Sequence, residues 1–201
     1  PAPGPGGSVT PMTSPHASAA APFGRVLTAM VTPFHADGSL DLDAAQKVAS
    51  HLVDQGNDGL VISGTTGESA TTTPDEDGDL LRAVLDAVGD RATIVAGVGN
   101  NDTAASCRLT RQACDAGAHG VLLVSPYYTR PPQAGLVRHF RTVADAGDLP
   151  VMLYDVPGRT AVRIGLQTFV EVAAHERIVA VKDATGDLVA GSRMMAETGL
   201  A

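Results

Sequence analysis

The sequence lacks the features that would tie it to nucleic acid or to a membrane. Its 201 residues include 14 Lys and Arg against 22 Asp and Glu, a formal net charge of −8, with no run of basic residues. Proteins that bind nucleic acid need a basic face to neutralise phosphates, so no nucleic-acid partner is expected. The longest apolar runs, such as 121–124 and 178–181, are far shorter than the roughly 18 residues of a membrane helix, so no membrane partner is expected either.

Cysteines and metal-ligand clusters are equally scarce. The two cysteines, Cys107 and Cys114, stand seven positions apart in a helical pattern. That spacing separates them by about 10 Å along a helix axis, too far for a disulfide within the helix. We therefore expect reduced thiols and a cytoplasmic protein. The six histidines show no ligand spacing, so we predict no metal.

The chain is expected to form a tail and one domain. Residues 1–22 contain six of the 13 prolines, much Gly, Ser and Ala, and no charge. This composition is typical of a disordered tail, and it lacks the basic start and apolar stretch of a secretory signal. Residues 23–201, of which many are apolar, are long enough for one substantial core.

From residue 23 onward, short apolar runs alternate with helical patterns. The runs begin about 30 residues apart, which is the length of one βα unit. We predict strands that begin near residues 26, 60, 93, 121, 151 and 178. Helical periodicity covers 42–55, 74–88, 103–116, 132–146 and 165–174. Strands that are apolar throughout favour a parallel sheet, either open or part of an eightfold barrel.

A lysine follows the last predicted strand directly. Lys182 comes straight after the apolar run 178–181, so we expect it to project from a buried strand end, where parallel folds place their active sites. Burial lowers the pKa of a lysine and leaves some free amine to attack a ketone. A rim lysine paired with Asp183 or Asp187 fits the same position, and position alone does not decide.

Three other predicted strands are also followed by polar residues. The run 64–68 (GTTGE) is either a tight turn or a cradle of N–H and hydroxyl donors for a carboxylate. Tyr154 and Tyr128 are either packing residues or proton relays near the amine. Arg159 is either a solvated arginine or the group that clamps an anionic substrate.

Four motifs, in this order, closely resemble those of the dihydrodipicolinate synthase family of pyruvate-dependent aldolases and lyases. They are GTTGES at 64–69, PYYTRPP at 126–132, YDVPGRT at 154–160 and VKDATG at 181–186. The resemblance implies a (β/α)8 TIM barrel followed by a helical region. It therefore implies that this chain is a barrel truncated after about six βα units, with roughly two more units expected beyond Ala201.

The resemblance also implies roles for single residues. Lys182 matches the lysine that forms an imine with pyruvate, and Tyr154 matches the tyrosine that passes protons to and from that carbon. Thr65 and Tyr128 match the rest of the proton relay. Thr65 and Thr66 match the pair that grips the pyruvate carboxylate.

Two further roles concern the second substrate and the assembly. Arg159 matches the arginine that receives the carboxylate of aspartate semialdehyde, and Tyr128 matches a tyrosine that enters the neighbouring subunit, which implies a homodimer or homotetramer. The activity implied is the condensation of pyruvate with aspartate 4-semialdehyde to 4-hydroxy-tetrahydrodipicolinate, in diaminopimelate and lysine biosynthesis. The lysine itself replaces a cofactor.

Two alternatives stay open on the sequence. One is a 2-keto-3-deoxy sugar-acid aldolase or an enzyme like sialic acid lyase, because such relatives share the lysine and the tyrosine. The other is a fragment or binding protein without a closed catalytic site.

Asp155 and Asp183 replace the commoner asparagine and glutamate of the family. Residues of feedback-inhibited members are replaced as well, which implies weak or absent inhibition by lysine; the residues found there are Pro74, Asp77 and Ala105.

Overall fold

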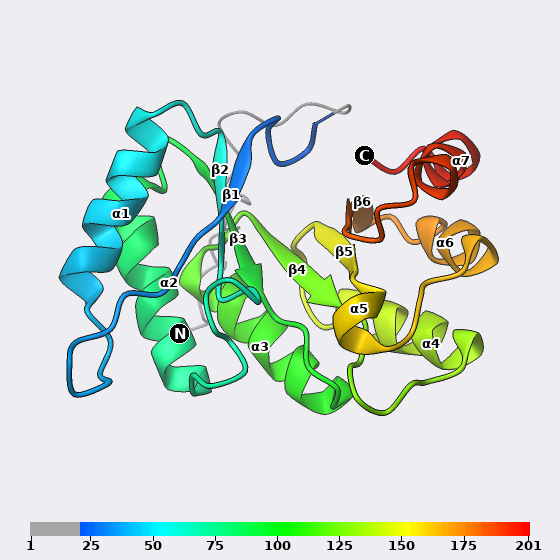
Figure 1. The fold of residues 1–201 in the computed structure, drawn as a ribbon, viewed down its shortest axis with the longest axis horizontal. Coiled ribbons are helices and arrows are strands. Elements are labelled where there is room, and N and C mark those ends of the chain that lie inside the picture. The colour runs from blue at the N-terminus through cyan, green and yellow to red at the C-terminus, as the bar shows by residue number, and fades with distance from the viewer. Residues whose placement is uncertain (1–20) are drawn as a thin grey trace, which may run out of the picture.

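The computed structural model describes residues 21–201, in which strands and helices alternate along the chain (Figure 1). The strands are β1 (Leu27–Ala29), β2 (Gly59–Ile62), β3 (Thr93–Gly97), β4 (Gly120–Val124), β5 (Val151–Asp155) and β6 (Ile178–Asp183). The helices are α1 (Leu42–Asp54), α2 (Pro74–Val88), α3 (Thr103–Ala116), α4 (Gln133–Ala144), α5 (Pro157–Thr160), α6 (Leu166–Ala173) and α7 (Leu188–Thr198). The predicted strands and helices are confirmed to within about two residues, whereas α5 and α7 were missed. The predicted tail lies almost entirely outside the described residues.

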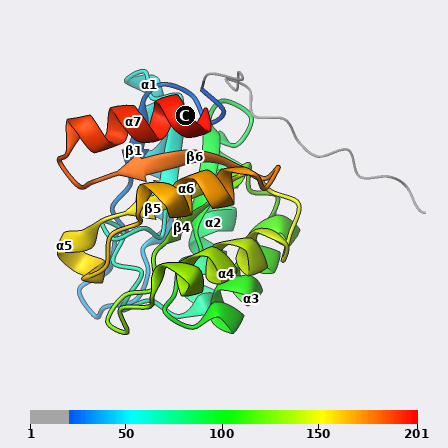
Figure 2. The same ribbon diagram turned by 90° about the vertical axis from the view of Figure 1, so that its right-hand side faces the viewer.

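The order of the strands distinguishes a barrel wall from an open doubly wound sheet. All six strands pair in parallel, and their order in space, β1-β2-β3-β4-β5-β6, is their order in the chain. A doubly wound sheet would instead place later strands on both sides of the first. The helices form an arc outside the curved sheet (Figures 1 and 2), so the structure is a partial (β/α)8 barrel, as predicted.

The last described residue already pairs with β6. The N–H of Ala201 donates to the carbonyl of Val179 at 3.1 Å, and its carbonyl accepts from the N–H of Val181 at 2.8 Å. These two bonds are the pattern of a parallel strand beside β6. Ala201 therefore occupies the place of the next strand in the barrel wall.

The two faces of the sheet carry different side chains because successive residues of a strand alternate. The outward residues, such as Ile94 and Leu153, pack under the helices in the larger apolar cluster. The inward residues, such as Val95 and Tyr154, form a smaller cluster inside the curve of the sheet. This alternation decides which polar residues at the strand ends face the inside of the barrel.

Capping bonds fix where the helices begin. At the start of α1, the Asp41 side chain accepts from the N–H of Ala44 at 2.8 Å. At α2, Thr73 and Glu76 form a reciprocal capping box, which satisfies two N–H groups of the first turn. The box also ends the loop that follows β2, the loop that contains the GTTGE motif.

Two further properties concern the described residues as a whole. Between residues 21 and 201, none of the helices combines the length and the apolar character that crossing a bilayer requires. Cys107 and Cys114 both lie on α3 as free thiols, the first of them buried. The predicted placement of both cysteines on one helix is therefore confirmed.

Candidate active site

Lys182 and Tyr154 lie side by side on the inner face of the sheet. They are register partners on β6 and β5, and the Lys182 Nζ lies 4.4 Å from the centre of the Tyr154 ring. Tyr154 is buried and Lys182 is half-buried. Burial lowers the pKa of the Lys182 amine, because loss of water disfavours the ammonium form. The structure thus gives this lysine the environment of a nucleophilic amine.

The competing interpretation of Lys182 as a rim lysine in an ion pair does not hold within residues 21–201. Its two expected partners are engaged elsewhere. Asp183 accepts from the N–H of Thr185 at 2.8 Å, and Asp187 pairs with Arg163 at 3.2 Å. No ion pair of Lys182 with either carboxylate is formed in this part of the chain.

A buried hydrogen bond from outside the GTTGE loop supports the conformation of this loop. The hydroxyl of Thr32, which follows β1, donates to the carbonyl of Gly67 at 2.6 Å in a buried bond. Glu68 adopts a positive φ of 61°, a conformation that a non-glycine residue keeps only when its surroundings hold it there. The loop turns Thr65 and Thr66 outward as exposed side chains. Such a held loop is suited to present donors to a ligand.

A cavity of about 300 Å³ opens beside this loop, at the carboxyl edge of the sheet. Thr65, Arg159 and Tyr127 line it, so the structure brings together two of the predicted substrate-binding residues. Thr66 does not contribute to its lining. Among the described residues Arg159 forms no ion pair, so its guanidinium is available to an anion. The remaining lining residues are Glu68, Ser69, Ala70, Thr72, Pro74, Asp77, Gly97, Gly99, Asn100, Leu109, Val124, Val156 and Thr160.

One wall of this cavity contains two of the three positions linked to feedback inhibition. Pro74 and Asp77 line it at the start of α2, while Ala105 does not. Burial raises the pKa of the Asp77 carboxyl, opposed by a hydrogen bond from the Thr72 hydroxyl at 2.8 Å. The expected insensitivity to lysine stays a prediction.

Neither Lys182 nor Tyr154 lines this cavity, and the predicted relay residue Tyr128 lies outside it as well. Its side chain is 86% exposed, and its backbone has a positive φ of 72°. The neighbouring Tyr127 lines the cavity instead. The motif PYY could have pointed to either tyrosine, and the role of Tyr128 in a neighbouring subunit stays a prediction.

Sequence patterns did not point to Thr32 or Glu68, for different reasons. Thr32 lies 35 residues from the glycine that it supports, so no local pattern connects the two. Glu68 stands within the motif but had no assigned role. Within residues 21–201, no group of three or more His, Cys, Asp or Glu side chains is placed to hold a metal ion.

Comparison with known proteins gives consistent matches. The model of the Dihydrodipicolinate synthetase family matches residues 22–200. A 4-hydroxy-tetrahydrodipicolinate synthase of Acidothermus cellulolyticus is 69% identical over 181 residues, 90% of this chain and 59% of the relative. The crystal structure of a dihydrodipicolinate synthase of Bacillus anthracis matches with a TM-score of 0.86 and 44% identity, over 88% of this chain and 60% of that one.

A third match is a complex with pyruvate. The chloride-inhibited dihydrodipicolinate synthase of Acinetobacter baumannii, complexed with pyruvate, is 38% identical with a TM-score of 0.84, over 87% of this chain and 60% of that one. The chain therefore spans about six tenths of the length of the proteins that it matches.

Proposed function

Because this chain belongs to the Dihydrodipicolinate synthetase family, we propose that it contains the Schiff-base site of an enzyme that condenses pyruvate with aspartate 4-semialdehyde. The observation that carries the proposal is the half-buried amine of Lys182, 4.4 Å from the centre of the Tyr154 ring. The relative from Acinetobacter baumannii, complexed with pyruvate, supports pyruvate as the first substrate. The product would be 4-hydroxy-tetrahydrodipicolinate, in diaminopimelate and lysine biosynthesis.

The proposed chemistry begins at the Lys182 amine. The free amine attacks the ketone carbon of pyruvate, and water leaves to give an imine. Because an imine nitrogen is protonated more readily than a ketone oxygen, the methyl group loses a proton at neutral pH and an enamine forms. The enamine carbon attacks the aldehyde, whose oxygen takes up a proton. The amino group of the second substrate then displaces Lys182 and closes the ring.

The neighbouring residues have supporting roles in this scheme. The Tyr154 phenol moves protons to and from the reacting carbon, with Thr65 and the Tyr128 of a second copy as its relay. Thr65 and Thr66 hold the pyruvate carboxylate. Arg159 receives the carboxylate of the semialdehyde through charge-assisted hydrogen bonds.

A trapping experiment tests the proposal. The purified chain is incubated with pyruvate and sodium borohydride, which reduces an imine where it forms, and the added mass is located by peptide mapping. The sequence has two lysines, Lys47 and Lys182, and Lys47 is exposed on α1. A pyruvate-dependent adduct on Lys182 supports the proposal. A protein that is folded by circular dichroism and gives no adduct there overturns it.

Arg159 tests which aldehyde is used. We expect Arg159→Ala to raise the KM for aspartate semialdehyde roughly tenfold to a hundredfold, because a charge-assisted hydrogen bond of about 1.5–3 kcal/mol is lost. Steady-state kinetics measures this change, and trapping of pyruvate on Lys182 should stay normal. Arg130→Ala is the matched control, since Arg130 is exposed after β4 but does not line the cavity. An unchanged KM would favour the sugar-acid aldolase.

The assembly and the location follow as parts of the same proposal. We infer that residues 23–201 form the catalytic barrel portion, and that copies of the protein pair as a homodimer or homotetramer in which Tyr128 crosses to the neighbour. The exposure of this tyrosine, 86%, supports the pairing. The free thiols support a reducing compartment, the cytoplasm.

A further inference from the structure

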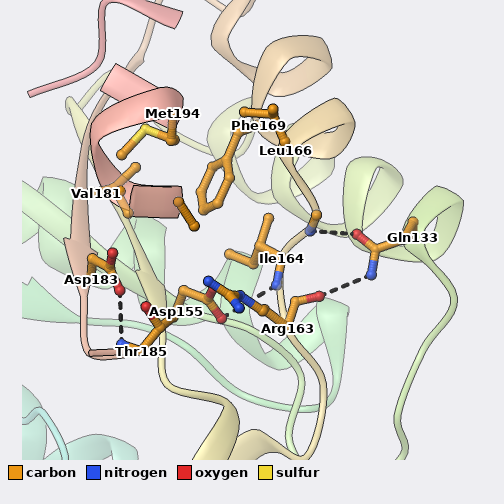
Figure 3. Close-up of a pocket in the computed structure, with 13 residues that line it drawn as sticks. Gln133, Asp155, Arg163, Ile164, Leu166, Phe169, Val181, Asp183, Thr185 and Met194 are labelled. Atoms are coloured by element: carbon orange, nitrogen blue, oxygen red, sulfur yellow. Dashed lines mark hydrogen bonds between the residues drawn. The ribbon is translucent and has the colours of Figure 1, made fainter. Parts of the chain in front are cut away.

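Asp155 lies directly after Tyr154 on β5 but points to the opposite face of the sheet. Its side chain is only 2% exposed. It borders a second cavity, of about 440 Å³, between β6 and the helices α6 and α7 (Figure 3). Burial raises the pKa of the Asp155 carboxyl to about 6, opposed by the Ile164 N–H and by Arg163. The cavity is large enough for water, so this carboxyl can exchange its proton.

Asp155 connects two segments that follow site residues. Its Oδ1 accepts from the N–H of Ile164 at 3.3 Å (Figure 3), five residues after Arg159. Its backbone carbonyl accepts from the N–H of Ala184 at 2.9 Å, two residues after Lys182. One residue thus joins the segment that follows the Arg159 turn to the segment that follows Lys182.

The charged groups that face Asp155 come from two directions. Asp183 is its register partner on β6 and raises the pKa of Asp155, whereas Arg163 lowers it. Arg163 is itself paired with Asp187, at the start of α7. From α4 the only contribution to the lining is the neutral Gln133, and Lys182 lies on the inner face of the sheet. The side chains from α6 and α7 at this cavity are apolar, namely Leu166, Phe169, Ala190 and Met194.

The segment around Ile164 has ties of two kinds. The Gln133 side chain accepts from the N–H of Gly165 at 2.8 Å and donates to the carbonyl of Arg163 at 2.9 Å. These bonds do not titrate. Hydrogen bonds from the Ala190 N–H and from Arg163 lower the pKa of Asp187, so the Arg163–Asp187 pair stays charged near neutral pH. Among these ties, the hydrogen bond to Asp155 is the one whose acceptor changes its charge near neutral pH.

We propose that Asp155 is a positioning residue whose ionised carboxylate fixes the Arg159 turn for an anionic substrate, and whose protonation loosens that turn. A hydrogen bond to a carboxylate is stronger than one to a neutral acceptor, so the Ile164 N–H is held more firmly when Asp155 is charged. Burying the Asp155 carboxylate lowers the stability of the fold, and proteins commonly keep such destabilising residues where they serve function. The expected effect on substrate binding rests on the function proposed above, but the hydrogen bond between Ile164 and Asp155 does not.

Amide hydrogen exchange at Ile164 tests the tie without any need for activity. In the wild type, the protection of this amide, corrected for intrinsic exchange, should rise about fivefold between about pH 5 and pH 7.5. In Asp155→Asn it should stay flat, because the amide oxygen still accepts but does not titrate. Asp183→Asn should move the wild-type rise to lower pH by removing the neighbouring charge. A flat wild-type profile, or the same rise in Asp155→Asn, would overturn the proposal.

Kinetics of the same variants separate positioning from simple support. The wild-type KM for aspartate semialdehyde should rise about fivefold below about pH 6, while the Asp155→Asn KM does not vary with pH there. Gln133→Ala is the matched control, since it loosens the same segment equally at all pH values. Adding Asp155→Asn to Arg159→Ala should have no further effect on KM, and additive effects would contradict the route through Arg159. If no imine forms on Lys182, the proposed function fails. Hydrogen exchange at Ile164 still tests whether the charge of Asp155 controls its bond to Ile164.

Thermal unfolding provides a test with a defined sign. The pKa of Asp155 lies near 6 in the folded protein against an ordinary value of 3.8, so the folded state binds this proton more tightly. Wild-type stability should therefore fall as pH rises from about 4 to about 6 and level off above that range. Asp155→Asn escapes this loss, so its Tm advantage should be at least about 4 °C larger at pH 7.5 than at pH 4.5. A Tm difference that does not change with pH contradicts the titration.

Discussion

Lys182→Met is expected to abolish the trapping of pyruvate by borohydride. The substitution removes the nucleophile but keeps an unbranched side chain of similar length against the Tyr154 ring, so the inner cluster stays packed. With no amine there is no imine, and the adduct in the peptide that contains residue 182 should fall below detection. Mass spectrometry of the reduced, digested protein measures this directly.

The control for this substitution is available because the chain has a second lysine. Lys47 is exposed on α1, outside the barrel interior, so Lys47→Met should leave the adduct on Lys182 unchanged. If instead pyruvate is still trapped in Lys182→Met but not in Lys47→Met, the imine forms on Lys47 and the assignment of Lys182 is wrong. Circular dichroism of both variants checks that each is folded.

Tyr154→Phe is expected to slow proton exchange at the methyl group of pyruvate by roughly a hundredfold or more, the usual effect of losing a general acid–base group. The phenyl ring keeps the packing of Tyr154 and its contact with Lys182, and only the hydroxyl is lost. The measurement is the incorporation of deuterium into pyruvate in D2O, followed by NMR, which needs no second substrate.

The same variant should still form the imine, which makes the result specific. Trapping on Lys182 should persist in Tyr154→Phe, since the amine and its burial are unchanged. Lys182→Met sets the baseline for exchange without the enzyme's imine. Exchange at the wild-type rate in Tyr154→Phe would show that another group moves the proton, and Tyr127, on the wall of the neighbouring cavity, would be the next to test.

Sequence patterns predicted the βα units well but did not predict two helices, α5 and α7. The reason is physical. The long helices have one clear apolar face, and their ends match the predictions. α5 has four residues, including a proline and a glycine, and so resembles a turn. α7 contains Gly191 and exposes Leu188 and Val189, which blurs its amphipathic pattern.

The site was predicted in part. Lys182 and Tyr154 could be found because each stands where an apolar strand ends within a recognisable motif, and the structure places them together. Thr65 and Arg159 meet in one cavity as well. Asp155 had no assigned role, since its importance depends on Ile164 and Asp183, which reach it through the fold rather than through the chain.

The sequence by itself determined the repeating βα pattern, the family and the lysine that follows a buried strand, because these depend on local periodicity and on motifs of a few residues. Tertiary structure decided the rest. Strand order distinguished a barrel wall from an open sheet, and the alternation of side chains turned Tyr154 inward and Asp155 outward. It also left Tyr128 exposed. Such features depend on contacts between residues distant in the chain, and packing free energy, which local sequence does not encode, selects among them.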